Sequence, residues 1–133
     1  MNAVFLDTVG LLATWDKADQ WHPVASAVHE QILRDRILVT TTTAVLLECG
    51  NAAARKPFRE DVVTLRNRLE RNNLLVPVED DDWQAAWFAY ARGAQGSAGI
   101  VDQLSFAVMR RLGLTQVFTN DQHFRAAGFE TLF

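Results

Sequence analysis

This sequence of 133 residues lacks the features of secreted, membrane and disulfide-bonded proteins. Its single cysteine, Cys49, excludes an intrachain disulfide, and a small domain without one is typical of a reducing compartment. No uncharged run reaches the ~18 residues that a membrane-spanning helix needs. The N-terminus lacks the basic segment of a signal peptide, and Asp7 interrupts its apolar run. We therefore expect a cytoplasmic protein with no membrane partner.

An excess of basic residues is also absent, since 13 Lys and Arg face 16 Asp and Glu, for a net charge of −3. A general basic coat for nucleic acid is thereby excluded, so any such contact must come from a local patch. Hydrophobic residues make up 49% of the chain and charged residues 22%, which favours a packed core over disorder. The length suits a single domain over residues 1–133.

Short apolar runs alternate with segments of helical periodicity along the chain. The runs that suit strands are residues 3–6, 37–39, 74–78, 115–119 and 129–133. Helices are predicted over 10–15, 22–35 and 44–55, from Pro57 onward, and over 83–94, 101–112 and 121–127. Continuous apolar strands between helices indicate an α/β fold whose parallel sheet is covered by helices on both faces.

Two helix faces are predicted to lie in the core because their apolar residues repeat at helical spacing. One comprises Phe58, Val62, Leu65 and Leu69, and the other comprises Trp83, Trp87, Tyr90 and Ala94. The alternative for the second face is partial exposure at a dimer contact. The threonines at 40–43 follow the second strand and are candidates for the N-cap of the next helix.

Four carboxylates are predicted to converge at one edge of this sheet. In such sheets, ligands bind beyond the carboxyl ends of the strands. Asp7 follows the first strand directly, and Asp121 lies two residues after the fourth. Glu48 lies in the helix that follows the second strand. Asp102 is at the start of the helix that leads into the fourth strand, and a right-handed crossover returns that helix start to the same edge.

Carboxylates packed together repel one another and take up protons unless a cation neutralises them. Oxygen ligands suit Mg²⁺ or Mn²⁺, one ion or two, which can activate water against a phosphodiester. Taken singly, Asp7 and Asp121 could cap helices, and Asp102 could face a helix dipole. Glu48 lies in an apolar stretch, where a buried acid needs a partner. The conjunction of the four favours a metal site.

Other charged groups have a structural and a functional interpretation. Six basic residues fall within seventeen positions that begin at Arg55 and include Arg59. They form either a contact to an RNA backbone or a solvated helix face. The acids Glu79–Asp82 and the pair Arg110–Arg111 are interpreted as favourable partners of helix dipoles, rather than as a second metal site or a binding patch. His123 is close to Asp121 and could touch substrate, but packing is the favoured role.

In order and spacing, the acidic motifs resemble those of PIN domains, in particular the VapC-type toxins of toxin–antitoxin pairs. The matching segments are Leu6-Asp7-Thr8, Leu46-Leu47-Glu48, Ile100–Ser105 and, as the most specific, Thr119–Phe129. The resemblance implies a three-layer α/β/α PIN-like fold with a parallel sheet of four to five strands in the order 3-2-1-4-5. It also implies a Mg²⁺- or Mn²⁺-dependent endoribonuclease, a homodimer and a cognate VapB-type antitoxin whose tail covers the site.

The resemblance makes Asp7, Glu48, Asp102 and Asp121 the catalytic and metal-binding residues. Further candidates for substrate contact are Thr8, Thr119, Arg55 and Arg59. The RNA target stays open between tRNA, rRNA and mRNA.

One position departs from the family pattern. Val9 stands where the family often carries Ser or Asn to support the acidic cluster, so Thr8, Thr119 and Asn120 are candidates for the missing hydrogen bond. The alternative function is accordingly a catalytically weak or inactive PIN-like interaction module. A phospho-receiver, which also uses acids at a sheet edge, fits poorly because no lysine lies near the C-terminal strand.

Overall fold

β1 (Val4–Leu6) is the central strand of a parallel sheet in the computed structural model, which describes residues 2–133. The sheet has five strands in the order β3-β2-β1-β4-β5, as the resemblance implied. The register places Phe5 beside Thr40 on one side and beside Val117 on the other. The flanking strands are β2 (Val39–Thr42), β3 (Leu75–Val76), β4 (Gln116–Phe118) and β5 (Glu130–Thr131).

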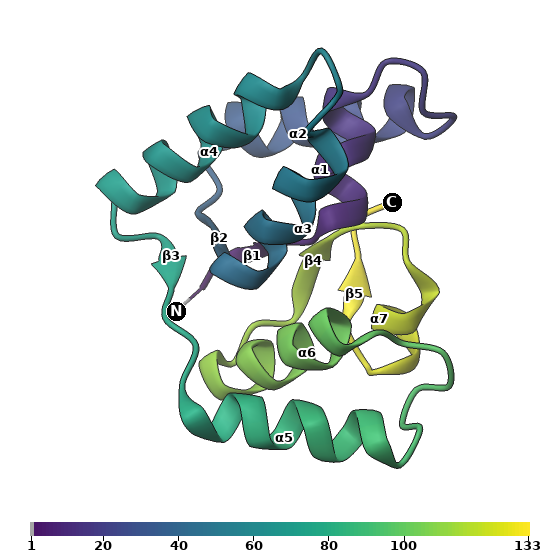
Figure 1. Cartoon of the computed structure of the whole chain (residues 1–133). Coiled ribbons are helices and arrows are strands. Elements are labelled where there is room, and N and C mark those ends of the chain that lie inside the picture. The colour runs from purple at the N-terminus through teal and green to yellow at the C-terminus, as the bar shows by residue number, and fades with distance from the viewer. Residues whose placement is uncertain (1) are drawn as a thin grey trace.

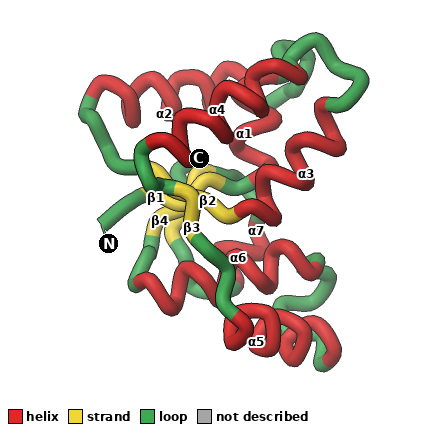
Figure 2. The backbone as a smooth tube through the Cα atoms, turned by 60° about the vertical axis from the view of Figure 1, so that its left-hand side comes forward, coloured by secondary structure: helices red, strands yellow, loops and turns green. Residues whose placement is uncertain are grey.

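Helices cover both faces of this sheet, as expected from its apolar strands. Four lie together on one side of the strands: α1 (Thr8–Trp15), α2 (His22–Arg34), α3 (Thr43–Ala53) and α4 (Arg59–Arg71) (Figure 1). On the other side, α5 (Asp80–Ala91) packs along α6 (Ile100–Leu112), and the short α7 (Gln122–Ala126) leads into β5. The separation is equally clear in the turned view (Figure 2). Among the described residues, none of the helices combines the length and apolar character needed to span a membrane.

β2 lies further along the chain than predicted. Ile37 and Leu38 are exposed, whereas the threonines of Val39–Thr42 are completely buried. Their hydroxyls are satisfied, since Thr40 Oγ1 donates to the Leu74 carbonyl (2.6 Å) and Thr41 Oγ1 donates to the Leu6 carbonyl (2.7 Å). Hydrogen bonding removes most of the cost of burying a hydroxyl, and β-branched side chains suit strands. The capping prediction holds for Thr42, which accepts a hydrogen bond from the Val45 N–H.

α4 buries its predicted face, because Phe58, Val62, Leu65 and Leu69 all belong to the core. Pro57 was expected in the first turn, but it precedes this helix, which begins at Arg59.

The prediction that α5 buries its aromatic face is wrong. Trp83, Trp87 and Tyr90 are 40%, 53% and 49% exposed, and the residues that α5 buries are Asp82 and Ala86. Successive helical residues are turned by about 100°, so the aromatic stripe lies on the flank of the face that contacts α6. A small Ala lets the two helices approach closely, and the large rings remain in solvent.

Candidate functional site

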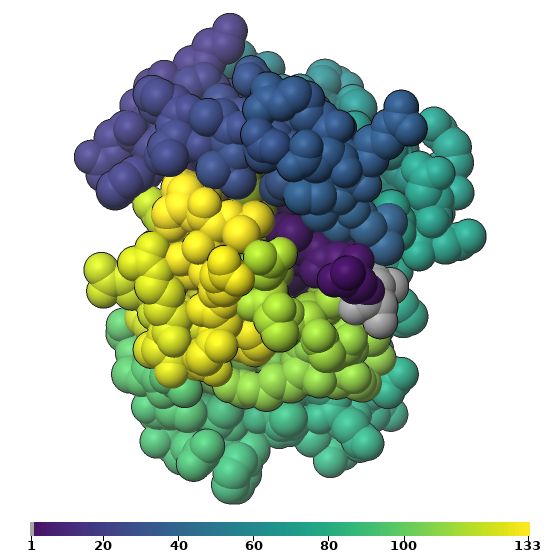
Figure 3. Space-filling view, turned by 180° about the vertical axis from the view of Figure 1, so that it is seen from behind, coloured from purple at the N-terminus to yellow at the C-terminus, as the bar shows by residue number. Residues whose placement is uncertain are grey.

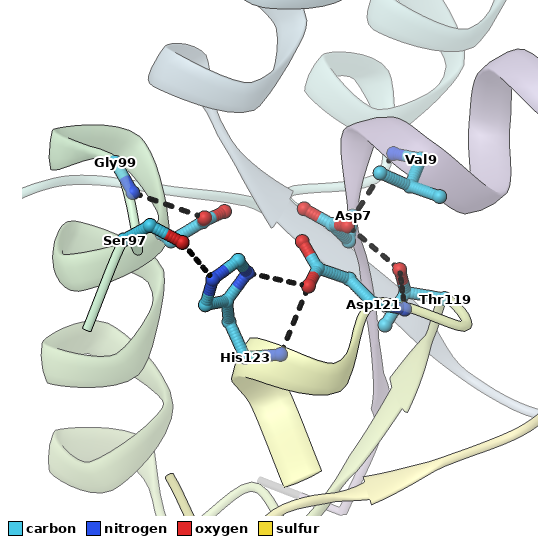
Figure 4. Close-up of polar contacts among 8 residues, drawn as sticks. Asp7, Val9, Ser97, Gly99, Thr119, Asp121 and His123 are labelled. Atoms are coloured by element: carbon cyan, nitrogen blue, oxygen red, sulfur yellow. Dashed lines mark hydrogen bonds and ion pairs between the residues drawn. The ribbon is translucent and has the colours of Figure 1, made fainter. Parts of the chain in front are cut away.

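Asp7 is positioned by the close crossing of α1 over the end of β4. A Cβ atom on Gly10 would lie 2.1 Å from the carbonyl oxygen of Phe118, so only glycine fits at this position. This crossing brings Thr119, the residue after β4, against Asp7, the residue after β1. The Thr119 hydroxyl donates to Asp7 Oδ2 at 2.8 Å, and the Val9 N–H donates to the same oxygen at 3.3 Å (Figure 4). Asp7 is thus both the cap of α1 and a buried member of the sheet edge.

Asp121 and Asp102 are held at the first turns of α7 and α6. Asp121 Oδ1 accepts from the His123 N–H (2.9 Å), and Asp102 Oδ2 accepts from the Gly99 N–H (3.3 Å). The capping interpretation and the cluster interpretation therefore both apply to these residues. In Figure 4 the carboxylates of Asp7 and Asp121 face each other across a short gap.

The electrostatics of this cluster lack a balancing charge. Burial, followed by the charges of Asp102 and Asp121, raises the pKa of Asp7 from 3.8 to about 7, although the Thr119 hydrogen bond opposes the shift. Burial and the charges of Asp121 and Glu48 raise the pKa of Asp102 to about 6. Within residues 2–133, no Lys or Arg forms an ion pair with any of these carboxylates. Oxygen ligands with unbalanced negative charge fit a hard divalent cation.

Glu48 is the exposed member of the group, which corrects the expectation of a buried acid. Its neighbours Leu46 and Cys49 point into the core, while Glu48 itself faces outward from α3. The Thr8 hydroxyl donates to Glu48 Oε1 at 2.7 Å. Glu48 therefore belongs to the cluster through its charge, which acts on Asp102, rather than through burial.

His123, for which the sequence favoured packing over substrate contact, makes polar contacts at the cluster. Its Nδ1 lies 2.7 Å from Asp121 Oδ1, and its Nε2 lies 3.0 Å from the Ser97 hydroxyl (Figure 4). Asp102, Asp121 and His123 each offer an atom within 4.8 Å of the others, close enough to share a metal ion. The available signal was a histidine two residues after a capping Asp, because the cap side chain folds back over the first turn to the His123 N–H.

The four candidates for substrate contact differ in their surroundings. Thr119 and Thr8 both donate to carboxylates, and Thr119 supplies the polar support that Val9 cannot give. Arg59 donates to the Ala54 carbonyl (3.3 Å), and in the described part of the chain no hydrogen bond or ion pair joins Arg55 or Arg59 to the cluster. Substrate contact by these residues stays a prediction.

The second acidic group, Glu79–Asp82, has a structural role. Asp82 accepts a hydrogen bond from the Glu79 N–H (2.9 Å) and caps its own helix. Arg111 of α6 also donates to Asp82 from two nitrogens, at 2.9 to 3.1 Å. Arg111 is therefore the ion-pair partner of a neighbouring helix, and not merely a dipole partner at the end of its own. Burial alone would raise the pKa of Asp82, but the hydrogen bonds and charge of Arg111 together with the Glu79 N–H lower it.

The comparisons with known proteins agree with this geometry. The family model of the PIN domain matches residues 4–130. The 23S rRNA-specific endonuclease VapC20 of Mycobacterium tuberculosis is 28% identical over 131 residues, which cover 95% of each chain. Its crystal structure, described as that of a sarcin-ricin loop cleaving toxin, matches 96% of both chains at 27% identity with a TM-score of 0.75.

A more distant structure shares the fold. FitAcB from Neisseria gonorrhoeae covers all of this chain and 97% of its own, at 18% identity with a TM-score of 0.64. The family match spans β1 to β5 and includes all four predicted carboxylates. This chain therefore belongs to the PIN domain family.

Proposed function

We propose that this chain is an endoribonuclease that hydrolyses RNA phosphodiester bonds with the help of Mg²⁺ or Mn²⁺. The observation that carries the proposal is the carboxylate cluster around buried Asp7, which has no Lys or Arg partner within residues 2–133 and in which the pKa values of Asp7 and Asp102 are raised to about 7 and about 6. The similarity to VapC20, which is named a 23S rRNA-specific endonuclease, supports the same activity.

Each carboxylate has a defined part in this proposal. Asp7, Asp102 and Asp121 hold the cation, because their neighbours already fix their orientation through hydrogen bonds from Thr119, Gly99 and His123. Exposed Glu48 lies at the rim, where it adds negative charge on the solvent side. A bound Mg²⁺ or Mn²⁺ supplies a water of lowered pKa and stabilises the charge that develops on the phosphodiester.

The test is cleavage of RNA by the wild type, Asp7→Asn and Asp81→Asn in the presence of Mg²⁺ or Mn²⁺. Asp81 is the matched control, because it is an exposed acid of the second group. Asp7→Asn should lose activity by about a thousandfold, the effect of losing several kcal/mol of charge stabilisation. Asp81→Asn should be unchanged. Equal cleavage by Asp7→Asn, with its fold intact, would refute the assignment.

The RNA substrate is proposed to be ribosomal. VapC20 is described as cleaving the sarcin-ricin loop, and it aligns with nearly the whole of this chain. Parallel digests of 23S rRNA, tRNA and an mRNA pool should show discrete cuts in the first. Cuts confined to tRNA or mRNA would move the target to another RNA class.

Two partners follow from the toxin similarity. We propose a cognate VapB-type antitoxin and a homodimer in which a second copy covers the exposed aromatic stripe of α5, Trp83, Trp87 and Tyr90. Sedimentation of the isolated chain should give a dimer, and Trp87→Glu should give a folded monomer. A wild-type chain that stays monomeric at high concentration would contradict the proposed homodimer.

The alternative function is a PIN-like module that binds a partner without cutting RNA. That function requires no divalent ion, so a Mn²⁺ titration separates it from the enzyme. Absence of Mn²⁺ binding at millimolar concentration would favour the module.

A further inference from the structure

His123 makes more polar contacts around the cluster than packing alone would require. Its backbone N–H and its ring Nδ1 both lie within hydrogen-bond distance of one oxygen, Asp121 Oδ1, at 2.9 and 2.7 Å. Its Nε2 lies 3.0 Å from the hydroxyl of Ser97, in the loop between α5 and α6. We propose that His123 is a positioning residue that fixes the orientation of Asp121 and is itself anchored by Ser97. This proposal rests on the proposed nuclease function.

The hydrogen-bonding capacities of the groups assign the direction of each contact. An ionised carboxylate only accepts hydrogen bonds, so Nδ1 carries the proton and donates to Asp121. In the tautomer with its proton on Nδ1, Nε2 accepts a hydrogen bond from the Ser97 hydroxyl. Within residues 2–133, Asp121 Oδ2 has no hydrogen-bond donor, and Figure 4 shows this second oxygen directed toward Asp7. Because His123 donates to Oδ1 of Asp121, Oδ2 of the same carboxylate is left for the cation.

The backbone around His123 is rigid enough for this role. The next residue, Phe124, is fully buried and meets Phe106 of α6 edge to face, with 4.9 Å between the ring centroids. Ser97 lies two residues before Gly99, whose N–H holds Asp102. The contact between Ser97 and His123 thus joins the segment that positions Asp102 to the helix that positions Asp121. Such support of a ligating carboxylate typically alters metal affinity by about 10–100-fold.

Direct ligation of the metal by His123 is the competing role. The distances allow it, because a ring nitrogen of His123 lies within 4.8 Å of ligand atoms of Asp102 and Asp121. With the proton on Nδ1, however, one ring nitrogen donates to Asp121 and the other accepts from Ser97. Ligation of an ion by His123 would therefore break one of these two contacts.

Two amide variants test the assignment because they mimic different nitrogens of the ring. In His123→Asn the amide nitrogen replaces Nδ1 and keeps the donor to Asp121, whereas in His123→Gln the amide group reaches the Nε2 position and keeps only the Ser97 contact. We expect His123→Asn to bind Mn²⁺ within about threefold of wild type and His123→Gln to bind it about 10–100-fold more weakly. RNA cleavage should follow the same order, and the metal-free variants should melt at similar temperatures.

Spectroscopy separates this proposal from direct ligation and from failure of the nuclease assignment. The electron paramagnetic resonance of bound Mn²⁺ should show no coupling to a coordinated imidazole nitrogen. Equal loss of Mn²⁺ affinity in both variants, or a nitrogen coupling that disappears in His123→Asn, would overturn the proposal. If the wild type binds no Mn²⁺, the nuclease assignment fails, and ¹⁵N shifts of the metal-free His123 ring still report the tautomer. An Nε2-protonated ring there would refute the positioning role.

Discussion

Two groups of four acids in this chain have opposite electrostatic characters. Asp7, Glu48, Asp102 and Asp121 meet at the sheet edge with no Lys or Arg partner among residues 2–133, and the pKa values of Asp7 and Asp102 are raised. Glu79–Asp82 are consecutive in the sequence, and the buried member, Asp82, pairs with Arg111 and has a lowered pKa. In the first group the missing positive charge must come from outside the chain, whereas in the second the chain provides it. The presence of a counter-charge, rather than the number of acids, distinguishes the two acidic groups.

The largest expected effect is on catalysis by the first group. Asp102→Asn should reduce RNA cleavage by about a thousandfold, because the cation loses a ligand and its charge stabilisation. Asp80→Asn, an exposed acid of the second group, serves as the matched control and should leave the rate unchanged. If both variants cleave at the wild-type rate, the contrast between the groups has no functional meaning.

A stability effect should mark the second group. Arg111→Met leaves the carboxylate of Asp82, whose side chain is 4% exposed, without its cation. The free energy of unfolding in urea should fall by about 3 kcal/mol. The remaining folded protein should cleave RNA at the normal rate. An unchanged free energy of unfolding would show that Asp82 does not depend on Arg111.

The stability of the metal-free protein should depend on pH with the sign that the raised pKa values of the first group dictate. The pKa of Asp7 is about 7 in the folded state and 3.8 when unperturbed, so between these values the folded state binds more protons than the unfolded state. Stability should therefore fall as the pH rises from 4 to 7, by about 3 kcal/mol. Asp7→Asn should reduce this dependence to the smaller part that Asp102 contributes, and millimolar Mn²⁺ should flatten it. Stability that rises across this window in the wild type would contradict the shift.

The smallest effect should come from Glu48, which is exposed. Glu48→Gln keeps an acceptor for the Thr8 hydroxyl and removes one charge at the rim of the cluster. Cleavage should fall by about tenfold, the effect of roughly 1.4 kcal/mol. A loss as large as that of Asp102→Asn would place Glu48 among the essential ligands.

Sequence patterns predicted the convergence of the carboxylates at one sheet edge better than they predicted side-chain environments. The topology alone brings Asp7 and Asp121 to one edge, because both follow neighbouring parallel strands. The contact between His123 and Ser97 depends on a side-chain conformation and a loop path that no local pattern encodes. Two core predictions failed for related reasons. Periodicity could not show that α5 would bury Asp82 instead of Trp83, and the apolar count missed the buried hydroxyl of Thr41.

The hydrogen bond between Asp7 and Thr119 spans 112 positions of the chain and has a consequence for protein synthesis. During translation Thr119 is made 112 residues after Asp7, and Asp121 and His123 follow it. The C-terminal segment then settles beside the N-terminal strand (Figure 3). A nascent chain that has not yet reached Thr119 consequently lacks the assembled cluster. Any chemistry that needs the cluster therefore begins only after Thr119, Asp121 and His123 have been synthesised and have packed against Asp7.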